Sequence, residues 1–202
     1  MNQILEVKKN KSIYKIQLYI SIIAIIIFSV SFFIYKYNLN KKESISESLL
    51  KNYSISKLYS NSSINSDTNA DSNVIGIIEI PKLKISYPIF SGINDELLKI
   101  SPCRFYGSMP YSISNLCIAG HNYNNNKFFS NINQLTSDDY VIIYNNSMKK
   151  FTYIVTDNYE VESNDLSPIF SKDDNNIASL TLVTCNNINK KRIIVKAIIE
   201  NP

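Results

Sequence analysis

The chain has 202 residues and a formal net charge of +4, and its length allows one domain with a full core plus an appendage but excludes two large domains. The first 36 residues hold five lysines and one glutamate, which leaves sixteen basic and sixteen acidic residues for the rest. The basic charge therefore belongs to the amino-terminal segment. A neutral remainder excludes nucleic acid as a partner, because neutralising phosphates needs a clustered positive excess.

An uncharged apolar segment comes first in the chain. Residues 16–35 lie between Lys15 and Lys36 and have the length of a membrane-crossing helix. The segment is too long for the apolar region of a signal peptide, and no small-residue cleavage pattern follows it. A buried core helix would carry a polar face. We therefore predict a transmembrane signal anchor after a cytoplasmic tail of residues 1–15, although the lysines on both sides leave its orientation open.

The next segment, residues 36–73, is predicted to connect the anchor to a folded domain. Residues 41–59 carry apolar side chains at helical spacing, which favours a juxtamembrane helix. Residues 60–73 are nearly all Ser, Asn and Asp and cannot bury enough apolar surface to offset their ordering entropy, so they are predicted to form a flexible stalk. The folded domain is expected to span residues 74–202.

Short segments rich in Ile, Val, Thr and Tyr predict an all-β domain. The expected strands are Gly76–Ile80, Lys84–Pro88, Asn115–Ala119, Tyr140–Tyr144, Lys150–Asp157, Ser179–Thr184 and Arg192–Ile199. Two short helices are expected at 95–100 and 128–135. The number of strands and the absence of an internal repeat favour a closed or nearly closed barrel.

The three cysteines, at positions 103, 117 and 185, show no spacing typical of metal ligands. At least one thiol must be free, since three cysteines cannot all pair with one another. Cys117 lies within an apolar strand and is interpreted as a small core residue. A disulfide between Cys103 and Cys117 would require an oxidising compartment, and the spacing does not decide the matter.

Cys185 lies at the exit of a predicted buried strand, where a scaffold presents reactive groups. A polar turn of six residues follows, and Arg192 opens the next apolar strand. Two strands joined by so short a loop are expected to pair as a hairpin. The hairpin would place the Arg192 guanidinium near the Cys185 thiol, at the same end of the sheet.

His121 is the only histidine in the chain and follows the predicted strand 115–119. A thiol becomes a good nucleophile when it loses its proton, and imidazole is the usual group that takes and returns that proton. Taken singly, Cys185, His121 and Arg192 are each more typical of ordinary structural or solvated residues. Together, all at strand ends, they indicate nucleophilic catalysis.

These residues lie in segments that resemble the sortases, the membrane-anchored cysteine transpeptidases of Gram-positive bacteria. Residues 76–83 (GIIEIPKL) resemble the opening strand of the family, and residues 115–121 (NLCIAGH) resemble its catalytic histidine segment. Residues 181–185 (TLVTC) match its TLxTC signature, and Arg192 matches the family arginine in position. The similarity covers residues 74–200. It implies an eight-stranded β-barrel with short helices.

The resemblance also implies an activity. Cys185 would attack the threonine carbonyl of a Leu-Pro-any-Thr-Gly-like signal near the carboxyl end of a secreted protein, forming a thioester. His121 would protonate the departing amine and deprotonate an incoming peptidoglycan amine, and Arg192 would bind the substrate carbonyl or the oxyanion. The anchor 16–35 would then hold the catalytic domain on the extracellular face of the cell membrane.

Departures from the family pattern indicate which sortase class this sequence resembles. No Asp-Pro-aromatic lid precedes the barrel, which favours a housekeeping-type or class D-like enzyme over a pilin-polymerising one, and the connection 160–179 is too short for the long helix of class B. A position often filled by histidine in the family holds Cys103, to which we assign no role.

Calcium binding would need clustered acids. Asp95, Glu96 and Glu162 are candidates, but they are interpreted as surface acids, so no cofactor or metal is expected.

Two readings compete with an active wall-anchoring enzyme. One is an inactive barrel that only binds a peptide at the cell surface, and the other is a pilin-polymerising sortase. The presence of all three candidate side chains disfavours the inactive barrel. A different cell-wall Cys-His enzyme, the L,D-transpeptidase type, would show a Ser-any-Gly-Cys segment, which this sequence lacks.

Overall fold

The computed structural model describes residues 2–59, 74–108, 114–123, 125–170 and 177–200. The chain forms two compact units, residues 1–43 and 44–202, which are considered separately. Helix α1 (Asn2–Tyr59) covers both of the predicted helical segments without a break. Its segment Tyr14–Asn52 is long and apolar enough to cross a membrane. The predicted stalk, residues 60–73, lies outside the described residues.

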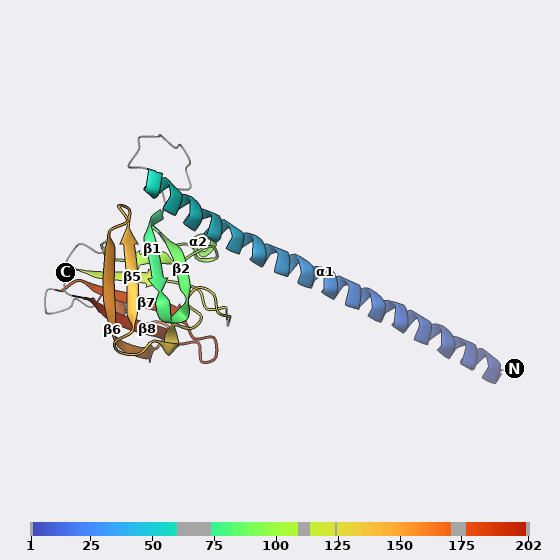
Figure 1. The fold of residues 1–202 in the computed structure, drawn as a ribbon. Helices are drawn as coiled ribbons and strands as arrows, with labels where there is room; N and C mark the ends of the chain where they lie inside the picture. Colours follow the sequence, from blue (N-terminus) through green and yellow to red (C-terminus); the bar gives the residue numbers. More distant parts are fainter. Residues whose placement is uncertain (1, 60–73, 109–113, 124, 171–176, 201–202) are drawn as a thin grey trace. The chain divides into compact units, whose positions relative to one another are not determined.

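The second unit contains a closed barrel of eight strands, which Figure 1 shows wrapped around a common interior. The strands are β1 (Val74–Ile80), β2 (Ile85–Phe90), β3 (Cys103–Tyr106), β4 (Asn115–Ala119), β5 (Tyr140–Asn145), β6 (Lys150–Val161), β7 (Ser179–Cys185) and β8 (Arg192–Ile199). Their order around the barrel is β1-β2-β3-β4-β7-β8-β6-β5, and β5 pairs with β1. The predicted eight-stranded all-β barrel is confirmed.

In the described part of the chain, four short helices join the strands. They are η2 (Pro81–Leu83), α2 (Asp95–Leu98), η3 (Ile132–Gln134) and α3 (Ser167–Phe170). None exceeds four residues, so each depends on the barrel for its stability rather than on its own hydrogen bonds.

The alternation of side chains along each strand fixes the register of the barrel. Leu180 and Leu182 of β7 and Val195 of β8 are fully buried in one apolar interior. Their neighbours along the strands therefore face outward on the other side of the sheet. On β7 and β8 that outer face includes the strand ends that carry Cys185 and Arg192.

A second, smaller apolar cluster involves the carboxyl-terminal part of α1. Leu49 and Leu50 pack against a cluster that includes Ile77 and Phe90, and Ser46 is buried. The compact unit that holds the barrel therefore starts at Ser44, whereas the sequence places the start of the domain at residue 74. The difference arises because these apolar helix residues bury surface on the barrel.

The structure adds one strand to those predicted and corrects one predicted helix. Strand β3, which the sequence did not indicate, has only four residues and pairs with β2 through the single pair Phe90 and Cys103. The predicted helix 128–135 is wrong apart from the single turn η3. Phe128 has a positive φ of 51°, a conformation that an α-helix cannot contain.

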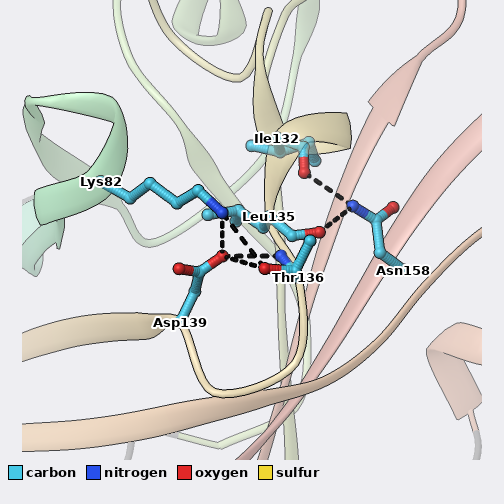
Figure 2. A network of polar contacts seen from close by, with 6 residues as sticks. All are labelled: Lys82, Ile132, Leu135, Thr136, Asp139 and Asn158. Atoms are coloured by element: carbon cyan, nitrogen blue, oxygen red, sulfur yellow. Dashed lines mark hydrogen bonds and ion pairs between the residues drawn. The ribbon is translucent and has the colours of Figure 1, made fainter.

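A polar network holds the connection between β4 and β5, as Figure 2 shows. The Asp139 carboxylate accepts hydrogen bonds from Lys82 Nζ at 2.7 Å and from the Thr136 amide at 2.6 Å. The Asn158 amide donates to the carbonyls of Ile132 at 3.0 Å and Leu135 at 2.7 Å. Side chains from η2 and β6 therefore fix the end of a connection that begins at His121.

Candidate active site

The hairpin of β7 and β8 places Cys185 directly opposite Arg192, as predicted. The Asn186 amide donates to the Lys191 carbonyl at 2.8 Å and closes the loop between the two strands. Arg192 Nη1 lies 2.5 Å from Cys185 Sγ and donates to it. Both side chains are half-buried. A cation held by the hairpin thus contacts the sulfur.

A glutamate on β6 holds the same loop from the side. The Glu160 carboxylate accepts hydrogen bonds from Asn186 Nδ2 at 2.5 Å and from Asn189 Nδ2 at 2.8 Å. These two hydrogen bonds hold the pKa of Glu160 below its usual value. The carboxylate is therefore charged at neutral pH and binds both ends of the turn.

His121 comes one residue after Gly120, which continues the pairing between β4 and β7. The Gly120 amide donates to the Val183 carbonyl at 3.0 Å, and its carbonyl accepts from the Thr184 hydroxyl at 2.7 Å. A Cβ atom on Gly120 would lie 2.6 Å from the ring of Phe129, so no larger residue fits there without a shift of that buried ring. Glycine therefore allows the chain to approach Phe129 where it leads into His121.

The ring of His121 packs against an aromatic neighbour. Its centroid lies 4.9 Å from that of Tyr123, with 35° between the planes, and Tyr123 in turn contacts Phe128 edge to face at 5.6 Å. The His121 carbonyl accepts from the Phe129 amide at 3.1 Å. Backbone and ring contacts therefore both restrict the imidazole.

Asn122 links the histidine segment to the cysteine segment. Its Nδ2 donates to the Cys185 carbonyl at 2.8 Å, and its own carbonyl accepts from Asn187 Nδ2 at 2.7 Å. The two bonds run in opposite directions between the loops that follow β4 and β7. They hold the residues next to His121 and Cys185 together.

The three side chains predicted from the sequence line one groove with a volume of about 310 Å³. The remaining lining is mainly apolar, with two carboxylates. It consists of Ile93, Asp95, Leu98, Phe105, Ala119, Gly120, Ser163, Asp165, Leu166, Ile169, Val183, Thr184 and Ile194. The structure thus brings His121, Cys185 and Arg192 together at one opening to solvent.

The other two cysteines are separated from this groove. All three cysteines are free, so Cys103 and Cys117 do not form the disulfide that the sequence left open. Burial raises the pKa of each of these two thiols to about 12. Both remain protonated and enclosed, and Cys185 is the cysteine that lines the groove.

The acids considered for calcium are spread over separate contacts. Glu96 forms an ion pair with Lys99 at 2.6 Å, and Glu162 forms one with Lys191 at 2.9 Å. Asp95 lines the groove. Among the described residues, no three His, Cys, Asp or Glu side chains gather as metal ligands.

Sequence reasoning missed the asparagines and the glutamate that support these segments. The sequence indicates only a polar turn after Cys185, and it assigns no role to Asn122 or Glu160. The contacts of the asparagines to Glu160 and Cys185 join residues more than twenty positions apart. No local signal in a single sequence reveals such pairs.

A closed β-barrel that presents a thiol, an imidazole and a guanidinium in one groove has the architecture of a cysteine transpeptidase. The sequence profile of the Sortase domain matches residues 78–200, which is more than half of the chain. The chain belongs to the sortase family, whose members are cysteine transpeptidases.

Solved structures of sortases have a similar fold. A Clostridium perfringens sortase D5 transpeptidase is 25% identical, with a TM-score of 0.59, over 78% of this chain and 97% of that chain. Listeria monocytogenes sortase A is 22% identical, with a TM-score of 0.57, over 64% of this chain and 88% of that chain. Clostridium perfringens sortase C, solved with the C-terminal cell wall sorting motif, is 23% identical, with a TM-score of 0.56, over 83% and 96%. No curated protein sequence matches the chain significantly.

Proposed function

We propose that this sortase cleaves a Leu-Pro-any-Thr-Gly-like signal at the carboxyl end of secreted proteins and transfers them to an amine of the cell wall. The observation that carries the proposal is the Cys185 thiol in a groove with His121, in contact with the Arg192 guanidinium. The apolar part of α1 would anchor the enzyme in the cell membrane, with the barrel on the extracellular face.

The chemistry proceeds in two acyl transfers. Cys185 Sγ attacks the carbonyl carbon of the signal threonine, and the C–N bond to the following residue breaks as His121 gives a proton to the departing amine. A thioester remains on Cys185. The incoming amine then loses a proton to His121 and attacks the thioester carbonyl, and the C–S bond breaks to release the free cysteine.

Arg192 would stabilise the oxyanion that forms in both transfers. Its guanidinium has five N–H donors in a rigid plane, and the donor that contacts Cys185 leaves others on the same group. A cation fixed near the reacting carbon stabilises negative charge on the carbonyl oxygen at the moment it develops. The contact with Sγ also keeps this guanidinium next to the attacking sulfur.

The lining of the groove suits the apolar part of such a signal. Ile93, Phe105 and Leu166 are all more than a third exposed and belong to the wall of the groove. Exposed apolar side chains gathered at one hollow are typical of a binding surface. They would bury the leucine and proline of the signal while the threonine carbonyl reaches Sγ.

The experiment that tests this function uses a peptide library with the full-length protein in detergent micelles. Fluorogenic peptides that vary each position of the signal are incubated with the protein, and the acyl-enzyme is detected by mass spectrometry of the intact chain. We expect cleavage after threonine and a mass increase on Cys185 equal to the acyl fragment. Peptide binding without cleavage or adduct would favour the inactive binding barrel instead.

The class of sorting activity is testable in the same assay. We propose a class D-like or housekeeping-type wall anchor, because the sequence has no Asp-Pro-aromatic lid before the barrel. Small amines that mimic peptidoglycan stems or cross-bridges should accelerate release of the acyl group. Acceleration only by a pilin-derived lysine would identify a pilin-polymerising enzyme.

Replacing Arg192 with lysine is expected to lower kcat/KM for the peptide by about 10²-fold. Lysine keeps the charge but lacks the planar group that can contact sulfur and oxyanion at once. Steady-state kinetics on the purified variant measure the effect, with Lys191→Arg as the matched control at the neighbouring position. Near-normal turnover by Arg192→Lys would show that the arginine has only a structural role.

Removal of calcium is expected to leave turnover unchanged. Two of the acids that could bind the ion already pair with lysines, Glu96 with Lys99 and Glu162 with Lys191. An ion would have to compete with these cations for hard oxygen ligands. Peptide cleavage is measured with a chelator and with added calcium, and a several-fold activation by calcium would contradict this expectation.

A further inference from the structure

A lysine lies on the same face of the barrel as the candidate catalytic residues. In the hairpin of β7 and β8, Cys185 pairs with Arg192, Val183 with Ile194, and Thr181 with Lys196. Paired residues point to the same side of a sheet, and alternate residues along a strand share a face. Lys196 therefore lies two rows behind Arg192, beyond the groove floor formed by Val183 and Ile194.

The half-buried ammonium of Lys196 binds groups of the protein itself. Its Nζ donates to the Pro168 carbonyl and, at 2.9 Å, to the Thr181 hydroxyl. The Thr181 hydroxyl donates to Asn115 Oδ1 at 2.7 Å, and Asn115 Nδ2 donates to the Ile169 carbonyl at 2.9 Å. Lys196 of β8 and Asn115 of β4, linked through Thr181 of β7, thus bind two consecutive carbonyls of helix α3.

Helix α3 and the residue before it form part of the groove wall. Leu166 and Ile169 line the groove, and Ile169 is buried against the barrel. The helix has only four residues, too few to stay folded by its own hydrogen bonds. The contacts from Lys196 and Asn115 therefore help to fix the position of this wall.

These hydrogen bonds matter for stability because the groups that form them are shielded from water. Thr181 and Asn115 are both buried, and an ammonium held there is tolerated only where acceptors surround it. Cys117, which is paired in register with Thr181, is a neutral thiol and supplies no negative charge. The Pro168 carbonyl of α3 is therefore one of the acceptors that satisfy the Lys196 ammonium, and movement of α3 would remove it.

We propose that Lys196, Thr181 and Asn115 are positioning residues that hold the α3 wall of the groove and so set how tightly the enzyme binds the apolar part of its peptide. The inference rests on the proposed function for its kinetic consequence. None of the three residues lines the groove, so they act through α3 and not on the reacting atoms.

The test is the variant Lys196→Met in the full-length protein. Methionine retains most of the unbranched side chain but cannot donate to carbonyls. We expect KM for the fluorogenic signal peptide to rise about tenfold, while kcat and the rate of Cys185 alkylation by iodoacetamide stay within about twofold of the parent. Lys196→Arg should restore part of the affinity, and Lys150→Met, on the exposed start of β6, is the matched control.

A second measurement does not depend on activity. Hydrogen exchange of the backbone amides in residues 166–170 is expected to be faster in Lys196→Met than in the parent and unchanged in Lys150→Met. The milder Thr181→Val, which removes the shared hydroxyl, should act in the same direction if Lys196→Met folds poorly.

Two outcomes separate this inference from the proposed function. Unchanged exchange in α3, or an unchanged KM with a lower kcat, would overturn the positioning role of Lys196. If the parent enzyme cleaves no signal peptide but exchange in α3 still rises in Lys196→Met, the wall assignment stands and the proposed substrate is wrong.

Discussion

Replacing Cys185 with alanine is expected to lower peptide cleavage to the detection limit, a loss of about 10⁶-fold. Without the sulfur no thioester forms, and water alone attacks an amide far more slowly than a positioned thiolate. The half-buried side chain sits at the end of β7, so the barrel should keep its melting temperature within a few degrees. Fluorescence kinetics and thermal unfolding monitored by circular dichroism measure the two effects.

The matched control is Cys103→Ala. Cys103 is fully buried in the apolar cluster that includes Ile77 and Phe90, so its removal should cost stability, about 1 kcal/mol, and leave cleavage intact. Cys185→Ala is thus expected to lose cleavage and keep its stability, whereas Cys103→Ala is expected to keep cleavage and lose stability. Measurable turnover by Cys185→Ala, or loss of turnover in Cys103→Ala without unfolding, would contradict the assignment of Cys185 as nucleophile.

Local patterns in the sequence predicted most of the barrel because its strands have clear apolar segments and clear ends. The strand at 115–119 was predicted with its observed bounds, since apolar residues run up to Gly120. Strand β3 was missed because Phe105 and Tyr106 are partly exposed and its contact with β2 is a single residue pair. Such a strand exists through tertiary pairing and not through local preference.

The three principal side chains of the groove could be predicted, while their supports could not. Cys185 and Arg192 belong to one hairpin, so their proximity follows from a short loop and strand pairing. His121 reaches them because β4 lies beside β7 in parallel, a crossover pairing that composition does not reveal. The resemblance to sortases supplied that long-range information.

Supporting contacts depend on geometry that arises only when the barrel closes. Asn122 meets Cys185 across sixty-three positions, and Asn115 meets Ile169 across fifty-four. Asparagine is common in turns for local reasons, so its presence gave no sign of these roles. The residues that adjust the groove are therefore found from the structure, and those that define its chemistry are visible in the sequence.

Replacing His121 with alanine is expected to lower kcat/KM for the amide substrate by about 10²- to 10⁴-fold. The departing amine needs a proton as the C–N bond breaks, and His121 is the only histidine of the chain. Stopped-flow kinetics of acylation measure the loss directly. Because the substitution leaves space beside Tyr123, which packs against the ring in the parent, added imidazole should restore part of the rate.

A second substrate separates the acid role of His121 from a purely structural one. In a signal peptide whose scissile amide is replaced by a thioester, the leaving group departs as a thiolate and needs no proton. The His121→Ala variant should therefore be impaired far less on the thioester than on the amide. An equal loss on both substrates, with no rescue by imidazole, would mean that His121 only shapes the loop after β4. The ratio of the two losses thus tests proton transfer independently of substrate binding, since both peptides present the same side chains to the groove.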